Sequence, residues 1–175
     1  MATPTAFTGD TESSTHGPSG RDWAGLALCI LIALIPAIIV GVATSDDVSA
    51  WLPTINQPAI MPPTWLFGPV WTVLYVLIGT SFWRAWRATP AGSARTTLVV
   101  VFVVQLVLNT LWSLLFFQWR NFTWALIELI MLWVSIVALM RVSGRFDRTS
   151  MKMLIPYFCW VTFAGVLNFA FILVN

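Results

Sequence analysis

Charged side chains are scarce in this sequence. Only 9 Lys and Arg residues and 7 Asp and Glu residues occur among 175 residues, so charged residues make up 9% of the chain. Soluble domains carry about 25% charged and about 45–50% apolar residues, whereas this chain is 58% hydrophobic. Because a water-soluble surface cannot be built from so few charges, the composition excludes a soluble globular enzyme and predicts a polytopic membrane protein.

Histidine and cysteine are also nearly missing. The single histidine, His16, lies in a polar N-terminal segment, and Cys29 and Cys159 both lie within apolar runs. These residues provide neither a disulfide framework nor the ligand spacing of a metal site. The net charge is only +2, and no basic stripe alternates with aromatic residues as in a nucleic-acid groove. We therefore expect neither a metal centre nor a nucleic-acid partner.

Uncharged stretches long enough to cross a bilayer, about 20 residues each, divide the chain into five expected helices. These helices cover residues 23–45, 67–86, 96–119, 122–141 and 153–174. Residues 1–20 are rich in Ser, Thr, Gly and Pro and show no apolar periodicity, so they are predicted to form a disordered polar tail. The expected fold is all-α, with a single bundle of five transmembrane helices over residues 21–175.

Basic residues are distributed unevenly between the two sides of this expected bundle. If the tail and the second and fourth connections share one side, that side holds eight Lys and Arg residues, and the other holds only Arg120. Lys and Arg concentrate in cytoplasmic loops. The asymmetry predicts a cytoplasmic N-terminus and an outward-facing C-terminus in a cell membrane, the inner one where there are two.

A proline-rich loop, residues 46–66, joins the first two expected helices and contains no Lys or Arg. Its prolines are Pro53, Pro58, Pro62 and Pro63. Proline fixes φ and lowers the entropy lost on ordering, and long ordered loops are usually functional. We therefore predict a shaped lid. The alternative is a passive connector that lies on the bilayer surface.

Three expected helices each carry aromatic or amide side chains at helical spacing, on one face. These are Trp71, Tyr75 and Phe82 on the second, Gln105, Asn109, Trp112, Ser113 and Phe116 on the third, and Trp160, Phe163, Ala164, Leu167 and Asn168 on the fifth. If the faces converge under the lid, they enclose an apolar cavity with a few polar groups, which suits a large planar ligand. The alternative is a packed core in which the amides join the helices.

Three clusters of residues match one known family in order and spacing. The first is Trp51, Pro58, Pro62, Pro63, Phe67, Pro69, Val70, Trp71 and Tyr75; the second is Gln105, Leu106, Leu108, Asn109, Trp112, Ser113, Phe116 and Phe117; the third is Pro156, Tyr157, Trp160, Phe163, Ala164, Leu167 and Asn168. With these clusters the chain resembles the TspO/MBR family, the tryptophan-rich sensory proteins whose mitochondrial members are the translocator proteins. The resemblance runs from Trp23 to the C-terminus.

The resemblance implies a five-helix membrane protein, often a homodimer, that binds tetrapyrroles such as protoporphyrin IX without a required cofactor. It also implies a link to the regulation of tetrapyrrole metabolism or stress responses, and in some members the light-dependent degradation of porphyrin. The expected ligand-binding residues are Trp51, Pro58, Phe67, Trp71, Tyr75, Gln105, Asn109, Trp112, Phe116, Trp160, Phe163 and Ala164. Trp51 and Trp160 are the candidates for photochemistry. The alternatives are a transporter of porphyrins or other lipophilic molecules, and a sensor or scaffold that acts through a protein partner.

Some residues depart from these patterns. Family members often have Tyr and a basic residue where this chain has Leu52 and Gln57, which bears on ligand affinity. Glu128 is the one acid within an expected span, and a structural role is favoured for it over a functional one, with Ser135 or Thr123 as hydrogen-bonding candidates. Gly79 and Gly165 are interpreted as positions of close helix packing.

Overall fold

The structure, a computed structural model, describes residues 20–46 and 50–175, and these contain helices and loops but no strand. The helices are α1 (Gly20–Asp46), α2 (Phe67–Ala88), α3 (Ser93–Ser113), α4 (Phe122–Gly144), α5 (Arg148–Met153) and α6 (Ile155–Val174), with the 3-10 helices η2 (Leu52–Thr54) and η3 (Thr64–Leu66) and the π-helix η4 (Leu114–Gln118). Within these described residues, five segments are long and apolar enough to cross a membrane. The predicted all-α bundle of five transmembrane helices is therefore confirmed. The predicted polar tail lies outside the described residues, except for Gly20.

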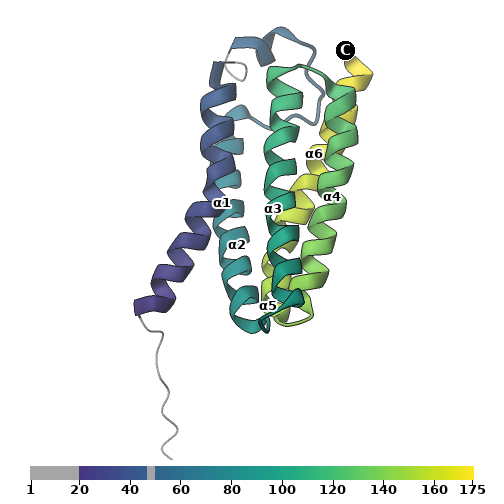
Figure 1. Cartoon of the computed structure of the whole chain (residues 1–175). Helices are drawn as coiled ribbons and strands as arrows, with labels where there is room; N and C mark the ends of the chain where they lie inside the picture. The colour runs from purple at the N-terminus through teal and green to yellow at the C-terminus, as the bar shows by residue number, and fades with distance from the viewer. Residues whose placement is uncertain (1–19, 47–49) are drawn as a thin grey trace, which may run out of the picture.

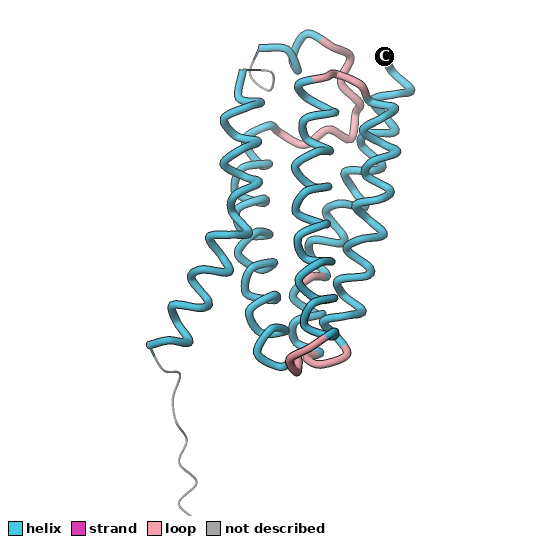
Figure 2. Tube along the Cα trace, viewed as in Figure 1, coloured by secondary structure: helices cyan, strands magenta, loops and turns pink. Residues whose placement is uncertain are grey.

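The helices stand side by side, and the connections gather at the two ends of the bundle (Figure 1). One end carries residues 50–66, which we call the lid, together with the α3–α4 connection and the C-terminus. We call this the lid end. The opposite end carries the α2–α3 connection and α5 (Figure 2). The bundle therefore has one end covered by a long segment and one end closed by short turns.

Two helix boundaries differ from the sequence prediction for identifiable reasons. α3 begins at Ser93, three residues before the expected start, directly after Gly92, which has a φ of 107° that favours glycine. The last expected span, 153–174, corresponds to α6, which begins two residues later at Ile155, next to Pro156, and the short helix α5 precedes it. Because proline has no N–H to donate, Pro156 begins a new helix more easily than it continues one.

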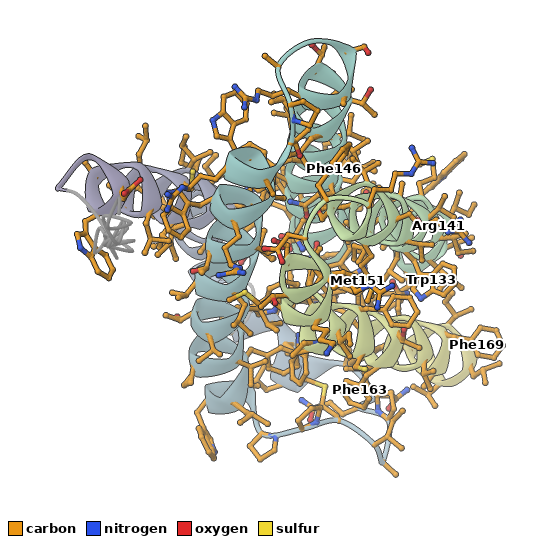
Figure 3. All side chains as sticks on the ribbon, turned by 90° about the horizontal axis from the view of Figure 1, so that it is seen from below. Trp133, Arg141, Phe146, Met151, Phe163 and Phe169 are labelled. Atoms are coloured by element: carbon orange, nitrogen blue, oxygen red, sulfur yellow. The ribbon has the colours of Figure 1, made fainter. Side chains whose placement is uncertain are left out.

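Small residues bring neighbouring helices into close contact. A Cβ atom added to Gly79 on α2 would lie 2.6 Å from the Ile30 Cα of α1 and 2.8 Å from the Cys29 carbonyl oxygen. A Cβ atom added to Gly165 on α6 would lie 3.1 Å from a methyl group of Leu129 on α4. These distances agree with the interpretation of both glycines as packing positions. On the outer side of α6, Phe169 is 51% exposed and projects away from the bundle (Figure 3).

Asp147 organises the end opposite the lid. Its carboxylate accepts hydrogen bonds from Arg84 on α2, from Ser150 and from the Thr149 backbone N–H, each at 2.9 Å, and it forms the N-cap of α5. Ser81 on α2 also donates to the Ser150 carbonyl oxygen at 2.9 Å. Burial disfavours the charged form, but these hydrogen bonds outweigh it and lower the pKa of Asp147 below its ordinary value. α5 is thus fastened to α2.

A candidate ligand cavity beneath the lid

A cavity of about 330 Å³ lies beneath the lid and is bounded by α1, α2, the α3–η4 junction and α6. Its lining consists of Ala37, Val40, Gly41 and Thr44 of α1; Leu52, Met61 and Thr64 of the lid; Phe67, Gly68, Trp71, Thr72 and Tyr75 of α2; Trp112, Ser113, Phe116 and Phe117; and Trp160, Phe163, Ala164, Leu167, Asn168 and Phe171 of α6. This volume falls in the range of small-molecule sites, about 300–1,000 Å³. Aromatic rings from three helices therefore meet in one cavity.

Eight of the twelve expected ligand-binding residues lie on the cavity wall. They are Phe67, Trp71, Tyr75, Trp112, Phe116, Trp160, Phe163 and Ala164. Neighbouring rings contact one another: Trp71 stacks on Tyr75 with centroids 5.4 Å apart, and Phe67 meets Trp160 edge-on at 5.9 Å. The parts of the three expected aromatic faces that lie toward the lid converge here, and contact with a ligand stays a prediction. Phe82, expected on the same face as Trp71 and Tyr75, stacks on Phe102 outside the lining.

The other four expected residues lie outside the lining. Trp51 stacks on Phe122 with centroids 6.0 Å apart, and it is the next residue, Leu52, that reaches the cavity and is 2% exposed. Pro58 is buried within the lid, where its carbonyl oxygen accepts a hydrogen bond from the Met61 N–H at 2.9 Å. Trp51 and Pro58 therefore belong to the part of the lid that does not border the cavity.

Gln105 and Asn109, the remaining two, form a buried hydrogen-bond chain behind the wall. The Tyr75 hydroxyl donates to Asn109 Oδ1, Asn109 Nδ2 donates to the Tyr157 hydroxyl at 3.3 Å, and Tyr157 donates to Gln105 Oε1 at 3.0 Å. Tyr75 is the member of this chain that lines the cavity. Since its proton is already donated to Asn109, Tyr75 can offer a ligand only the lone pairs of its oxygen.

A second polar pair closes the cavity on the side of α3 and α6. Trp112 Nε1 donates to Asn168 Oδ1 at 3.2 Å, and Asn168 Nδ2 donates to the Phe122 carbonyl oxygen at 2.9 Å. Asn168 is fully buried and was expected on the aromatic face, but it was not among the expected ligand-binding residues. These bonds fix the orientation of the Trp112 indole, and both Trp112 and Asn168 line the cavity.

The lid is held in place by hydrogen bonds to the end of α6. The side chain of Asn56 donates to the Val174 carbonyl oxygen at 2.9 Å, its backbone N–H donates to Asn175 Oδ1 at 3.1 Å, and Asn175 Nδ2 donates to the Asn56 carbonyl oxygen at 3.0 Å. Gln57 Nε2 donates to the Leu52 carbonyl oxygen at 3.2 Å. The lid is therefore a shaped segment, as its prolines predict, and Gln57 serves its internal structure.

The cavity is open on the side formed by α1 and α2. Gly41, Gly68 and Thr72 line it and are nevertheless exposed on the outside of the bundle. A Cβ atom added to Gly41 or Gly68 meets no atom within 4 Å. Sequence reasoning missed the contribution of α1 because this helix carries no aromatic face, and its only signal was the pair of small residues Gly41 and Thr44.

Glu128 is buried on α4 away from the cavity lining. Its side chain is 2% exposed, and neither carboxylate oxygen has a hydrogen-bond partner among the described residues. Ser135 donates to the Leu132 carbonyl oxygen at 2.7 Å instead. Neither Ser135 nor Thr123, the two candidate partners, forms a hydrogen bond to Glu128. Ser135 bonds back to its own helix, as hydroxyl side chains in helices commonly do.

Comparison with known proteins agrees with this architecture. A model of the TspO/MBR family matches residues 27–174 of the chain. The tryptophan-rich protein TspO of Chlorobaculum tepidum is 35% identical over 154 residues, which cover 86% of this chain and 95% of that relative. The protein of the same name from Archaeoglobus fulgidus is 34% identical over 152 residues, which cover 85% of this chain and 97% of that relative. The translocator protein of Homo sapiens is 28% identical over 120 residues, which cover 68% of this chain and 71% of that relative.

Proposed function

The chain belongs to the TspO/MBR family of integral membrane proteins, and on this premise we propose that it binds a planar tetrapyrrole such as protoporphyrin IX in the cavity beneath the lid. The observation that carries the proposal is the convergence of aromatic side chains from α2, α3 and α6 on one cavity beneath the lid. Flat apolar walls stabilise a flat apolar ring through burial and stacking. The binding would serve the regulation of tetrapyrrole metabolism or of a stress response.

The chemistry of the wall favours a metal-free porphyrin over haem. Among the described residues, the lining contains Met61 and Tyr75 but neither His nor Cys, and His is the commonest axial ligand of haem iron. The phenol of Tyr75 is engaged with Asn109, which restrains it from turning toward an iron atom. The ring is therefore expected to be held by stacking and by a few hydrogen bonds.

The proposal also includes an orientation in the membrane and an oligomeric state. The described basic side chains other than Arg120 lie at the end opposite the lid, which supports a cytoplasmic position for that end and an outward-facing lid. The chain is expected to form a homodimer, as the family resemblance implies. Cysteine labelling in sealed vesicles and a mass measurement in detergent would test these two points.

Ala164 provides the test of the binding site. It lines the cavity and is 7% exposed, so Ala164→Leu would place three additional carbon atoms in the ligand's space. Ala27 is an exposed residue on the outside of α1, and Ala27→Leu is the matched control. Protoporphyrin IX titrated in darkness should quench tryptophan fluorescence saturably in the wild type and in Ala27→Leu. Overpacking by about 1–3 kcal/mol corresponds to a weakening of about fivefold or more in Ala164→Leu.

Linear quenching that never saturates in any of the three proteins would contradict the proposal. Equal affinity of Ala164→Leu and Ala27→Leu would place the ligand elsewhere on the molecule. Because micelles also take up porphyrin, the same titration with a tryptophan ester dissolved in detergent micelles gives the quenching that does not depend on a protein site.

The position of Trp160 favours a second function, the light-dependent degradation of the bound porphyrin. Its indole lies on the cavity wall, within reach of a bound ring, whereas Trp51 lies behind Phe122. In this proposal dioxygen is the oxidant. The excited porphyrin takes an electron from the Trp160 indole, the porphyrin radical anion binds dioxygen, and the adduct returns one electron to the indole radical cation, so that the ring carries both oxygen atoms and Trp160 is regenerated. Loss of porphyrin absorbance under light, faster with protein than without it, is the expected result.

A further inference from the structure

The cavity beneath the lid opens sideways, between two of the membrane spans. Gly41 of α1 and Gly68 and Thr72 of α2 line the cavity and are also exposed on the outside of the bundle, and we call this gap the lateral opening. α1 and α2 stand side by side (Figure 1), and both are long and apolar enough to cross a membrane. The outer surfaces of these helix segments carry exposed apolar side chains, namely Ile38 and Val42 on α1 and Val73 and Val76 on α2. Since the outer surface of a membrane span faces the hydrocarbon, the lateral opening faces lipid.

Exposed tryptophans indicate the depth of the lateral opening in the membrane. Trp65, Trp119 and Trp124 are exposed at the lid end, and tryptophan is enriched where the lipid head groups meet the hydrocarbon. Thr72 lies about two helical turns beyond Trp65, which corresponds to about 10 Å along the helix axis. The lateral opening therefore begins near the head groups and extends into the lipid tails.

Packing does not explain the two glycines at the lateral opening. A Cβ atom added to Gly41 or Gly68 meets no atom within 4 Å, in contrast to Gly79, where it would lie 2.6 Å from the Ile30 Cα. Gly92 is the one described glycine with a positive φ, so backbone geometry does not require glycine at positions 41 and 68 either. Glycine lowers the stability of a helix relative to alanine. What the missing side chains provide at these two positions is a free passage.

The lid closes the other way into the cavity. Asn56 is joined to Val174 and Asn175 by three hydrogen bonds, at 2.9, 3.1 and 3.0 Å. The hydroxyls of Thr44 and Thr72, on the two helices of the lateral opening, instead donate to carbonyl oxygens of their own helices at 2.8 and 2.9 Å. A ligand that passes the lid must break three hydrogen bonds, whereas these two hydroxyls do not tie α1 to α2.

We propose that the planar ligand enters and leaves the cavity sideways through the lateral opening, from the lipid leaflet at the lid end, while the lid stays fastened to α6. This inference rests on the proposed function and adds the source of the ligand, which is the bilayer and not the water above the lid. A porphyrin acid suits this route, because its apolar ring dissolves among lipid tails while its charged carboxylates stay at the head groups. The lateral opening extends across the same two layers.

Relaxation kinetics within one bilayer test this route. Wild type, Gly41→Leu and Gly20→Leu are reconstituted in vesicles that contain excess protoporphyrin IX, and the change in tryptophan quenching after a temperature jump is followed in darkness. The slope of the relaxation rate against porphyrin per lipid gives the association rate constant, and the intercept gives the dissociation rate constant. Gly20→Leu is the matched control, because a Cβ atom there also meets no atom within 4 Å and Gly20 begins α1 at the opposite end.

The expected result is a slowing in both directions. Gly41→Leu should slow association and dissociation by about fivefold or more, since moving a side chain out of the passage costs about what overpacking costs. The change in dissociation is decisive, because a side chain that only occupied ligand space would speed dissociation. Gly20→Leu should match the wild type. Unchanged rate constants in Gly41→Leu, or slower association with faster dissociation, would refute passage through the lateral opening.

Locking the lid tests the other way in. Asn56 and Asn175 exchange hydrogen bonds, so cysteines at both positions can be joined by a disulfide or by a short linker between the thiols. Cys29→Ser and Cys159→Ser remove the native thiols. The cross-linked and the free form of Asn56→Cys/Asn175→Cys should have the same association rate constant. Slower association in the cross-linked form would overturn the inference and place the entrance at the lid.

The two tests also separate this inference from the proposed function. If the wild type shows saturable quenching and either test gives the contrary result, the cavity still binds the porphyrin and only the route is wrong. If the wild type shows no saturable quenching, the proposed function itself fails, and the inference fails with it.

Discussion

The buried hydrogen-bond chain of Tyr75, Asn109, Tyr157 and Gln105 predicts that one of its tyrosines determines mainly the stability of the protein and the other mainly its affinity for the ligand. Tyr157 is fully buried and lies outside the cavity lining, whereas Tyr75 lines the cavity and is 3% exposed. Each tyrosine can be replaced by Phe, which removes only the hydroxyl. We expect Tyr157→Phe to act mainly on stability and Tyr75→Phe to act mainly on ligand affinity.

The magnitudes follow from the hydrogen bonds that each change removes. Tyr157→Phe breaks two bonds, at 3.3 Å to Asn109 and at 3.0 Å to Gln105, and strands two groups in residues that are 1% and 0% exposed. Interhelical bonds in membranes average about 0.6 kcal/mol with a maximum near 1.7, and a stranded buried group costs about 1–3 kcal/mol. The expected loss is about 2–3 kcal/mol for Tyr157→Phe and about 1 kcal/mol for Tyr75→Phe, which breaks one bond.

Reversible unfolding in detergent, followed by tryptophan fluorescence, measures the free energy of unfolding of both variants. Thr162→Val is the matched control, because it removes an exposed hydroxyl that joins α6 to Trp133 at 3.0 Å, and it should cost about 0.5 kcal/mol or less. For protoporphyrin IX, Tyr75→Phe should raise Kd severalfold, since the ligand loses an acceptor on the wall. A Tyr157→Phe variant as stable as Thr162→Val would refute the assigned hydrogen-bond chain.

Three further perturbations test the cavity and the end opposite the lid. Gly68→Leu should slow porphyrin association from vesicles without reducing stability, because the added side chain meets open space at the exposed side of the cavity; an unchanged association rate would argue against passage at that side. Trp160→Phe should slow photobleaching of bound porphyrin more than Trp51→Phe does, and the reverse order would contradict the assignment of the electron donor. The pKa of Asp147 is lower in the folded state than its ordinary value near 3.8. The carboxylate therefore contributes to stability above pH 3.8, and this contribution is lost as the pH falls toward the lowered pKa. Between about pH 6 and pH 3 the free energy of unfolding should decline less in Asp147→Asn than in the wild type.

The fold was predictable from sequence to the extent that it depends on the lengths of uncharged runs. Five such runs give five spans, because the bilayer fixes the length that a helix needs. The exact helix starts depend on local backbone geometry that hydropathy does not describe. Gly92, with its φ of 107°, and Pro156, which separates α5 from α6, set two of these boundaries.

The cavity was predictable where it depends on helical periodicity and not where it depends on turns. The spacing of Trp71 and Tyr75 and of Trp160 and Ala164 placed them correctly on the faces that form the wall. Periodicity cannot tell the middle of a face from its edge, so it could not show that Asn109 lies behind the wall. In the lid, Leu52 lines the cavity and its neighbour Trp51 does not. The 3-10 turn of η2 and the hydrogen bond from Gln57 to Leu52 determine this arrangement.

The central claim is that a planar tetrapyrrole is held inside the lidded cavity and does not simply dissolve in the surrounding detergent or lipid. Circular dichroism in the porphyrin absorption band tests it most directly, because an achiral porphyrin gains a signal only when a chiral site fixes it. The wild type and Ala27→Leu should give a signal that grows with added protoporphyrin IX and saturates at one ligand per chain, and Ala164→Leu should give a much weaker one. No induced signal in the wild type, or an equal signal in Ala164→Leu, would contradict the placement of the ligand in this cavity.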